Sequence, residues 1–364
     1  MRRGIIGRFM PVNVCAWDDP ASWNEFVATT PRPHFQQSWE WGELAPELGA
    51  RAIRLAARCD GKFVGAMQVL LTPLGRTGQT YLYVPRGPAV FTPSMERLGP
   101  LLDAARLLGH DERAMGIKVE PNAPQGDECW KSSLATLGLR PSHPPNQPRS
   151  SWHLDISGGE ETLLAEMKQK TRYNIRLAAR KGVHVVEADE RDCDTFFRLY
   201  QETARRDDFF IQSKNFYRRL FDVFRGAGTF CMLLARRGED VLAAITLLRF
   251  GSACWYLHGA SSSRHRNLMA PYLLQWEGIR WAARQGCTLY DFRAVPDLLR
   301  EDQDMYGLYK FKEGFGGYQF TTLHARAAPY RAVPFQLWQL YSTGSFAARS
   351  WLRRRKGLPI RQSA

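Results

Sequence analysis

Residues 57–70 read ARCDGKFVGAMQVL, and residues 235–248 read ARRGEDVLAAITLL. In both stretches, charged residues and a glycine form a turn signal, and a continuous apolar run follows. This pattern is typical of a β-hairpin whose second strand is buried. Because Arg58 and Arg236 are 178 residues apart, the two stretches predict the same hairpin in each half of the chain.

The similarity between the halves continues beyond the hairpin. Two further pairs of segments align at an offset of 172 residues: YLYVPRGP (81–88) with ACWYLHGA (253–260), and GIKVEP (116–121) with TLYDFR (288–293). Helical periodicity lies between them, at residues 96–108 and 271–285. The ordered matches predict a duplicated unit of helices, an antiparallel meander, a helix and a further strand. This mixed α/β order favours a sheet flanked by helices, and it resembles the GNAT acyltransferase fold used twice.

A proline-rich run separates the two predicted domains. Residues 140–148 (RPSHPPNQP) cannot build a helix or a central strand. The chain has completed both repeats by residue 320, and we expect the remainder to return to the first domain. The first domain is therefore predicted to comprise residues 1–147 with 320–364, and the second residues 148–319.

The composition is that of a soluble, basic protein. The 364 residues contain 50 Lys and Arg against 36 Asp and Glu, and the resulting charge of +14 favours polyanionic partners. Seven scattered cysteines without a CxxC motif argue against a disulfide framework or a structural zinc site, and the dispersed histidines predict no metal. No apolar run is long enough for a signal peptide or a membrane span, so we predict a cytoplasmic protein.

One predicted helix carries a basic face. It runs from Glu161 to a terminating Gly182, and its basic residues recur every fourth position, at Lys168, Arg172, Arg176 and Arg180. The face is about 18 Å long, enough to meet several backbone phosphates. We predict that these four residues bind a nucleic acid backbone, although a solvated basic face without a ligand would have the same pattern, and Arg172 could instead be a packing or capping residue.

Several motifs together resemble a known family. They are FQQSWEWG (35–42), SWHLDI (151–156), MKQKTRYNI (167–175), GASS (259–262), LLQWE (273–277), YDF (290–292) and LYKFKEGFGG (308–317). In this order, over most of residues 30–325, they resemble the Fem (FemABX) family of aminoacyltransferases, which build peptidoglycan interpeptide bridges. The resemblance implies two tandem GNAT-like domains, with the acceptor on the first and aminoacyl-tRNA on the second. It implies no metal, no cofactor and no covalent enzyme intermediate.

The resemblance also implies the substrates. An amino acid would pass from aminoacyl-tRNA to the stem-peptide amine of UDP-MurNAc-pentapeptide or lipid II. The sequence lacks sustained heptads, so we predict no coiled-coil arm. Where relatives often place a phosphate-binding Lys, this chain has Leu44, Ala45 and Pro46, and Gln212 stands where an Arg is expected. Either Lys214, Arg218 or Arg86 compensates, or the acceptor is held differently, for instance as the lipid-linked precursor.

Acyl transfer requires positioning, a cation or donors at the oxyanion, and a route for protons. The family's Phe-Lys pair falls on Phe311 and Lys312. Phe311 would stack on a terminal base, and Lys312 would stabilise the oxyanion or the donor's terminal phosphate, although the same residues could be core and surface. Glu120 and Asp291 end equivalent strands of the two repeats, and either could accept the amine's proton or serve a structural role. The predicted acceptor-binding residues are Trp39, Arg86, Gln212, Tyr217, Tyr256 and His258, although Tyr256 and His258 could simply pack.

The C-terminal stretch combines aromatic and basic residues. The aromatics are Phe335, Trp338, Tyr341, Phe346 and Trp351, and residues 353–356 read RRRK. The stretch could lie on the anionic inner face of the membrane, grip tRNA, or simply pack against the protein.

Two rival functions use the same features. A CoA-dependent N-acyltransferase is disfavoured because residues 263–271 and 90–95 contain no glycine to cradle a pyrophosphate. A non-catalytic RNA-binding protein would use the basic helix and would not need the Phe311–Lys312 pair at a cleft.

Overall fold

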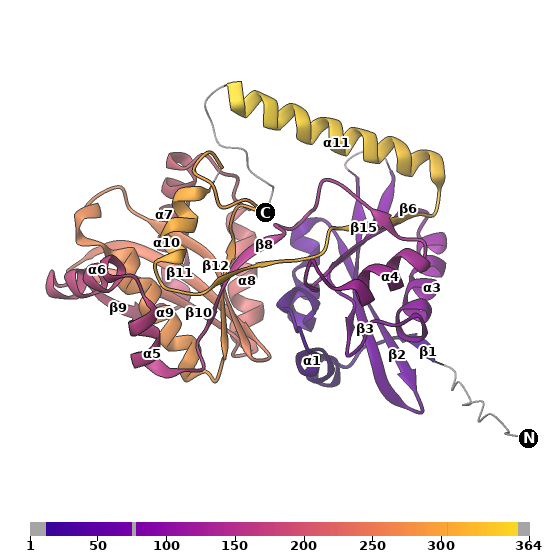
Figure 1. Ribbon diagram of the computed structural model, residues 1–364, viewed down its shortest axis with the longest axis horizontal. Helices are drawn as coiled ribbons and strands as arrows, with labels where there is room; N and C mark the ends of the chain where they lie inside the picture. Colours follow the sequence, from indigo (N-terminus) through magenta and orange to yellow (C-terminus); the bar gives the residue numbers. More distant parts are fainter. Residues whose placement is uncertain (1–11, 75–77, 304, 356–364) are drawn as a thin grey trace, which may run out of the picture.

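The computed structural model describes residues 12–74, 78–303 and 305–355, with side chains described through Gly344. Two twisted sheets lie side by side, each covered by helices (Figure 1). The strand order is β1-β2-β3-β4-β6-β15-β7 in the first sheet, where β5 also pairs with β3, and β14-β8-β13-β12-β11-β10-β9 in the second. The predicted mixed α/β fold of two GNAT-like units is confirmed.

The first sheet is built on the predicted hairpin. Strands β2 (Arg51–Cys59) and β3 (Lys62–Pro73) are joined by Asp60 and Gly61, both with positive φ, as a tight two-residue hairpin turn requires. Strand β4 (Thr80–Arg86) continues the meander, and helix α3 (Met95–Asp111) crosses to β6 (Ala114–Pro121), which runs parallel to β4. The other strands of this sheet are β1 (Asn13–Ala16), β5 (Ala89–Val90), β7 (Arg140–Pro141) and β15 (Arg326–Pro329).

The second sheet repeats this order. Strands β10 (Phe230–Arg237), β11 (Asp240–Phe250) and β12 (Ala253–Ser261) form the meander, and α9 (Ala270–Arg284) leads to β13 (Leu289–Ala294), parallel to β12. The helices predicted at 96–108 and 271–285 are thus present as α3 and α9. The remaining strands are β8 (Ser150–Asp155), β9 (His184–Glu187) and β14 (Tyr318–Thr321).

Further helices cover the sheets. In the first half they are α1 (Pro20–Thr29), η1 (Phe35–Gln37), α2 (Trp39–Glu43), η2 (Ala45–Leu48) and α4 (Glu128–Thr136). In the second half they are α5 (Gly159–Glu166), α6 (Gln169–Arg180), η3 (Glu190–Asp192), α7 (Cys193–Arg206), α8 (Lys214–Gly226), η4 (Arg266–Leu268) and α10 (Tyr306–Glu313). The last helix is α11 (Ala332–Arg355).

A hydrophobic cluster joins the two halves. Trp23 and Phe35 of the first half pack in one buried cluster with Phe216, Leu220 and Trp255 of the second half. The ring centroids of Phe35 and Trp255 are 5.2 Å apart. Because burial of large apolar side chains is strongly favourable, this shared core holds the two sheets in a defined relation.

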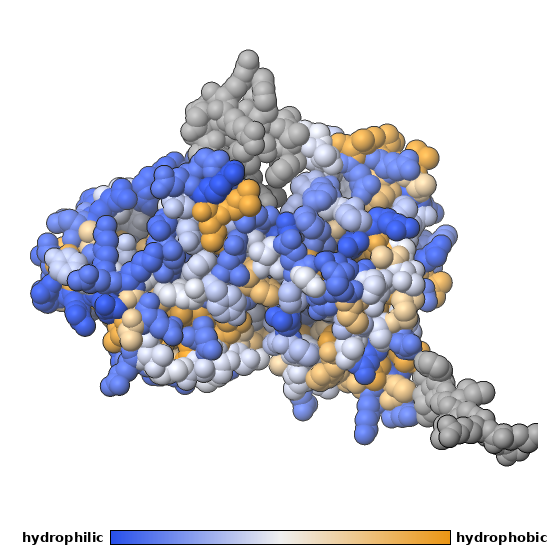
Figure 2. Space-filling view, viewed as in Figure 1, coloured by the Kyte–Doolittle hydropathy of each residue, from blue (hydrophilic) through white to orange (hydrophobic). Residues whose placement is uncertain are grey.

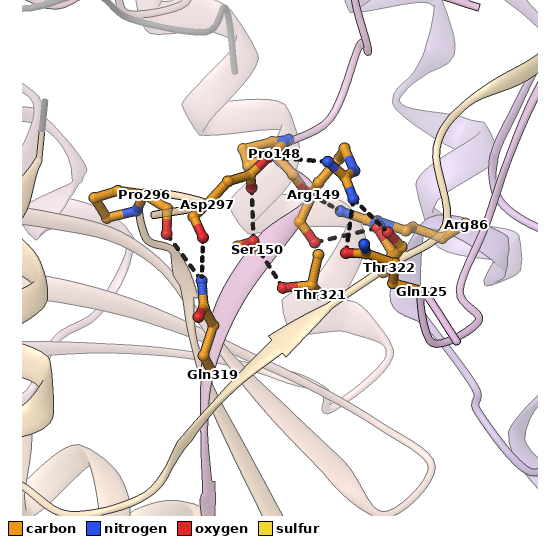
Figure 3. Close-up of polar contacts among 10 residues, drawn as sticks. All are labelled: Arg86, Gln125, Pro148, Arg149, Ser150, Pro296, Asp297, Gln319, Thr321 and Thr322. Carbon is orange, nitrogen blue, oxygen red and sulfur yellow. Dashed lines mark hydrogen bonds and ion pairs between the residues drawn. The ribbon is translucent and has the colours of Figure 1, made fainter. Parts of the chain in front are cut away.

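The two connections between the sheets are bonded to each other (Figure 3). Arg149 donates to Asp297 and Gln125 at 3.0 Å and to the carbonyl of Thr322 at 3.4 Å, so it links both halves. The N–H of Thr322 donates to the carbonyl of Arg149 at 2.9 Å, and Ser150 bonds Asp297 at 2.6 Å. The segments that pass between the sheets therefore form a hydrogen-bonded pair and are not free linkers.

The predicted single helix from Glu161 to Arg180 is wrong in one respect. It is broken into α5 and α6 at Met167, whose extended backbone (φ −64°, ψ 146°) lets its side chain enter the core. Lys168 then donates its N–H to the carbonyl of Gly314 at 2.9 Å. Arg172 fills the break by donating to the carbonyls of Leu164 (3.0 Å), Ala165 (3.3 Å) and Met167. At the break, the bond from Lys168 to Gly314, at the end of α10, thus takes the place of a hydrogen bond within a continuous helix.

The C-terminal helix α11 lies along the top of the first sheet (Figure 1). Phe335 is buried in a cluster with Tyr81 and Met115, and Trp338 packs 4.9 Å from the Tyr81 ring. The side chains of Phe346, Trp351 and residues 353–356 lie outside the described part of the chain. Among the described residues, no helix combines the length and apolarity that crossing a membrane requires.

We predict that Arg149→Met lowers the free energy of unfolding by about 1.5–3 kcal/mol, because it removes charged hydrogen bonds from a residue whose side chain is only 12% exposed. Urea unfolding measures this change. Arg300→Met is the matched control: it removes an ion pair to Asp302 in which both side chains are more than 60% exposed, and should cost less than about 1 kcal/mol. Equal losses in the two variants would contradict the role of Arg149.

Candidate active site

A cleft opens where the two sheets meet. Its cavity measures about 150 Å³ and is lined by residues of both halves and of the connections between them. The first half contributes His34 and Arg86, and the second contributes His153, Asp291 and Arg293. Five groups able to carry charge around one small cavity are unusual in a wall of structural residues, and such clusters mark candidate functional sites.

Asp291 and His153 form a pair across adjacent strands. They are directly opposed in the antiparallel ladder of β13 and β8, and Asp291 Oδ2 lies 3.4 Å from His153 Nε2. Burial alone raises the pKa of the Asp291 carboxyl, but His153, the N–H of Arg293 and the Arg293 charge together lower it. Asp291 is therefore a carboxylate at neutral pH.

Ser151 completes the group without forming a nucleophilic triad. Its Oγ lies 2.9 Å from His153 Nε2, the same ring nitrogen that Asp291 approaches. A Ser-His-Asp triad places the hydroxyl and the carboxylate on opposite nitrogens of the imidazole. The geometry thus supports a carboxylate that handles a proton, and it gives Ser151 no activating base.

A bend at the end of β13 positions the next residue. Arg293 has a positive φ of 60°, and the ladder with β8 shifts register between Asp291 and Ala294. The bend is held from both sides. The N–H of Arg293 donates to Asp291 Oδ1 at 2.6 Å, and Lys312 Nζ donates to the carbonyls of Arg293 (3.3 Å) and Ala294 (2.7 Å). Left-handed backbone at a bulky residue is strained and persists only with such support.

Lys312 lies behind this bend and not in the wall of the cleft. It is 2% exposed, and burial lowers its pKa to about 7, a fall that Asp291 opposes and Arg293 increases. Phe311 packs against Tyr272 (5.0 Å) and Phe315 (5.4 Å). The catalytic roles of Lys312 and Phe311 stay predictions, and the contacts of Lys312 are those of a residue that supports the backbone.

Glu120, the first-half counterpart of Asp291, is fully engaged in structural bonds. Its carboxylate accepts from Tyr83 Oη at 2.8 Å and from the N–H groups of Asn146 (2.6 Å) and Gln147 (3.1 Å), with Lys118 Nζ at 3.9 Å. It therefore holds the connection between the halves against β6. Its role as a proton acceptor stays a prediction, and only Asp291 of the two lines the cleft.

The predicted acceptor-binding residues fall in three places. Arg86 lines the cleft. His258 lies 5.2 Å from Tyr217 and bonds Thr246 at 2.9 Å, and burial lowers its pKa to about 3. Tyr256 lies near these rings, and the N–H of Gln212 donates to Tyr217 Oη. Trp39 lies on α2 at the edge of the hydrophobic cluster that contains Tyr217, with Arg54 3.5 Å above its ring. The structure thus does not bring the six together.

The positions that depart from the family pattern have clear environments. Leu44 is fully buried in the core shared by the halves, so packing replaces charge there. Lys214 and Arg218 both pair with Asp194, at 2.7 and 2.9 Å. Of the three cations proposed as substitutes, only Arg86 lines the cleft.

The four basic residues of the predicted helix have different environments. Arg172 donates to the carbonyls at the break between α5 and α6, as a capping residue does, and its role in binding tRNA stays a prediction. Lys168 pairs with Glu313 at 2.7 Å. Arg176 and Arg180 are exposed on α6.

Comparison with known proteins assigns the family. The family model described as "FemAB family" matches residues 137–237 and 233–323, which together span half of the chain. The chain belongs to the FemAB family. A lipid II:glycine glycyltransferase of Staphylococcus aureus (strain MRSA252) is 24% identical over 80% of this chain and 87% of that relative.

Solved structures agree with this FemAB assignment at the level of the fold. The crystal structure of FemX has a TM-score of 0.83 at 22% identity, covering 90% of this chain and all of FemX. A tandem GNAT protein from the clavulanic acid biosynthesis pathway has a TM-score of 0.55 at 13% identity, over 88% of this chain and 99% of that protein. The predictions of the Fem family, of tandem GNAT-like units and of an aminoacyltransferase are confirmed.

Three cleft residues of this FemAB chain were missed by sequence reasoning. His153 lies inside the motif SWHLDI, Arg293 directly follows YDF, and His34 directly precedes FQQSWEWG. Each of these residues lies within or next to a recognised motif, and this was the signal in the sequence that could have identified them. Which of them face a common cavity depends on the bend in β13 and on the docking of the two halves, which no local pattern reveals.

We predict that the stability difference between the parent protein and Lys312→Met rises with pH. The ordinary pKa of 10.5 applies in the unfolded chain and the folded value is about 7, so between these values the unfolded state binds more protons. The parent therefore gains stability from pH 7 upward, by as much as about 1.4 kcal/mol per pH unit. Urea unfolding at several pH values measures the difference, and a flat profile would mean that Lys312 stays charged.

Proposed function

We propose that this protein transfers an amino acid from aminoacyl-tRNA to the stem-peptide amine of a peptidoglycan precursor, building the interpeptide bridge. The observation that carries the proposal is the buried Asp291–His153 pair in a cleft between two GNAT-like halves. The similarity to lipid II:glycine glycyltransferases supports the reaction class and the precursor.

The chemistry assigned to Asp291 follows from its ionised state. The acceptor amine attacks the ester carbonyl, a C–N bond forms, and the bond from the carbonyl carbon to the ribose oxygen breaks. An amine becomes strongly acidic as it adds to the carbonyl, so a nearby carboxylate can take its proton and pass it to the departing oxygen. Lys312 acts in this proposal as a positioning residue, because it fixes the backbone of residues 293 and 294.

The acceptor is proposed to be lipid II and to lie on the first half. The two relevant departures from the family pattern, Leu44 and Gln212, remove charge from positions expected to hold the phosphates. A lipid-linked precursor relies less on such contacts because the membrane itself concentrates it. The names of the curated relatives support the same choice.

The donor tRNA is proposed to lie along the second half. Arg176 and Arg180 are exposed on one face of α6, with Lys168 at its start. Exposed cations spaced along a helix suit the phosphates of a nucleic acid backbone, and the net charge of +14 favours the encounter.

Helix α11 is proposed to rest on the anionic inner face of the membrane. Its outer side carries a stripe of exposed apolar residues: Val333 (67% exposed), Leu337 (63%), Leu340 (71%) and Tyr341 (75%). Figure 2 shows hydrophobic residues gathered along the top of the molecule, over α11. The spacing of four, three and one puts them on one face, and the same helix carries a basic sequence at residues 353–355, which suits anionic lipid.

A transfer assay tests the reaction. Purified protein, tRNAs charged with radiolabelled amino acids, and lipid II or UDP-linked muramyl-pentapeptide should give labelled peptide. Asp291→Asn should lower kcat by about 10²- to 10⁴-fold, the usual contribution of a positioned acid–base group. Asp302→Asn, an exposed carboxylate in a pair with Arg300, should leave kcat unchanged.

Two further results of this assay test the tRNA contact and the identity of the donor. Replacing Arg176 and Arg180 by Glu should raise the KM for tRNA and leave the KM for the acceptor unchanged. Label that stays on tRNA with both acceptors would exclude the proposed reaction and direct attention to acyl-CoA donors.

A flotation assay tests the membrane contact. The full chain should float with vesicles of phosphatidylcholine and phosphatidylglycerol and remain behind with phosphatidylcholine alone. Leu337→Ser with Leu340→Ser should weaken the association more than tenfold, given about 1.5–3 kcal/mol for each buried leucine. Leu107→Ser, a residue 69% exposed on α3, is the matched control. Equal flotation of both variants would exclude α11 as the contact.

A further inference from the structure

Arg293 projects a guanidinium into the cleft, where none of the residues that the structure describes bonds it. Its side chain lines the cavity, and its guanidinium carbon lies 5.8 Å from the centroid of the Phe35 ring. It makes no hydrogen bond or ion pair with any side chain or carbonyl among the described residues, although its own backbone is tightly held. A guanidinium has five N–H donors, and leaving them unused in a largely buried cleft is costly.

Arg86 faces the same cleft from the first half. Its guanidinium donates to Thr322 Oγ1 at 3.0 Å and to the carbonyl of Pro148 at 2.5 Å, so the two connections between the halves hold it in place (Figure 3). Like Arg293, it has a positive φ, of 54°. Two arginines on opposite halves, both on strained and supported backbone, thus line one cavity.

The charges of the cleft do not balance. The Arg86 and Arg293 guanidiniums face the single Asp291 carboxylate, and Arg32 adds a further cation at the exposed rim. Burial and the two arginines keep the pKa of His34 well below its ordinary value, so His34 is neutral. The Arg86 charge also contributes to lowering the pKa of Arg293. The buried wall therefore carries more positive than negative charge.

His34 adds a neutral donor to this wall. Its Nδ1 accepts from the N–H of Gln36 at 3.2 Å, so the proton of the neutral ring is on Nε2. The ring is fixed between Phe35 (4.6 Å) and Trp255 (5.0 Å). Donors that are immobilised before a ligand arrives lose little entropy on binding.

We propose that Arg86 and Arg293, with His34 beside them, bind one singly charged oxyanion that is already present on a substrate. The planar guanidinium matches the oxygens of a carboxylate or a phosphodiester. The identity of this oxyanion rests on the proposed transfer reaction. In that reaction it is either a carboxylate of the acceptor peptide or the phosphodiester beside the donor ester. Binding that group across both halves would place the reacting amine or ester next to Asp291.

Calorimetric titration of the full chain tests the site with three probes. N-acetyl-L-lysyl-D-alanyl-D-alanine presents a carboxylate, its C-terminal amide is the control that lacks this carboxylate, and cytidylyl-(3′→5′)-adenosine presents one phosphodiester. The parent protein should bind one of the two anionic probes, and the amide should bind at least tenfold more weakly than the carboxylate if the peptide is the source.

Variants of Arg293 give the decisive comparison, because its side chain bonds none of the described residues and its loss should not disturb the fold. Arg293→Gln should weaken the anionic probe tenfold or more, Arg293→Lys should restore part of the loss, and Arg300→Gln should have no effect. Failure of both anionic probes to bind the parent, or equal binding by the parent and Arg293→Gln, would overturn the proposal.

The two proposals fail in different ways. Binding that depends on Arg293 without any labelled product in the transfer assay would retain the oxyanion site and exclude the proposed reaction. Product formation with unchanged KM values in Arg293→Gln would retain the reaction and exclude the site.

Discussion

The hydrogen bonds around Arg149 and Thr322 fix the geometry on which the cleft depends. The chain crosses between the sheets at these residues in both directions, and each crossing bonds the other (Figure 3). The cavity is formed by residues of both halves, so its shape depends on their relative position. The shared core around Phe35 and Trp255 holds the halves together by burial of apolar side chains. The hydrogen bonds of the crossing fix their orientation, because hydrogen bonds are directional and burial is not.

The bend of β13 shows how a local departure from regular structure produces a site. A regular strand would place residues 291 and 293 on the same face and pair both with β8. The shift in register releases Arg293 from the ladder, and Asp291 and Lys312 satisfy the backbone groups that the bend exposes. The Lys312 amino group donates to two carbonyls, which gives it a structural role at the bend, and its catalytic role stays a prediction. The same observation separates the Phe311–Lys312 motif from the groups that line the cavity.

Sequence reasoning reached the fold because duplication repeats each signal. The hairpins at residues 57–70 and 235–248, the parallel strands and their crossing helices all occur twice, and Asp291 was found because it ends the strand equivalent to β6. His34, His153 and Arg293 were not found, since their convergence comes from contacts distant in sequence. The break at Met167 was also missed: helix propensity through Glu166–Arg180 is continuous, and the competing bond from Lys168 to Gly314 comes from a segment almost 150 residues away.

The position of β15 has a consequence for synthesis on the ribosome. Within the described part of the chain, strand β7 joins the first sheet only through β15, which lies between β6 and β7 and comes from residues 326–329. The edge of β6 that pairs with β15 therefore stays unpaired while the whole second half is translated. Exposed strand edges recruit other strands, so this interval is when the nascent chain is most prone to aggregate. The N-terminal half is thus first in the chain and last to be completed.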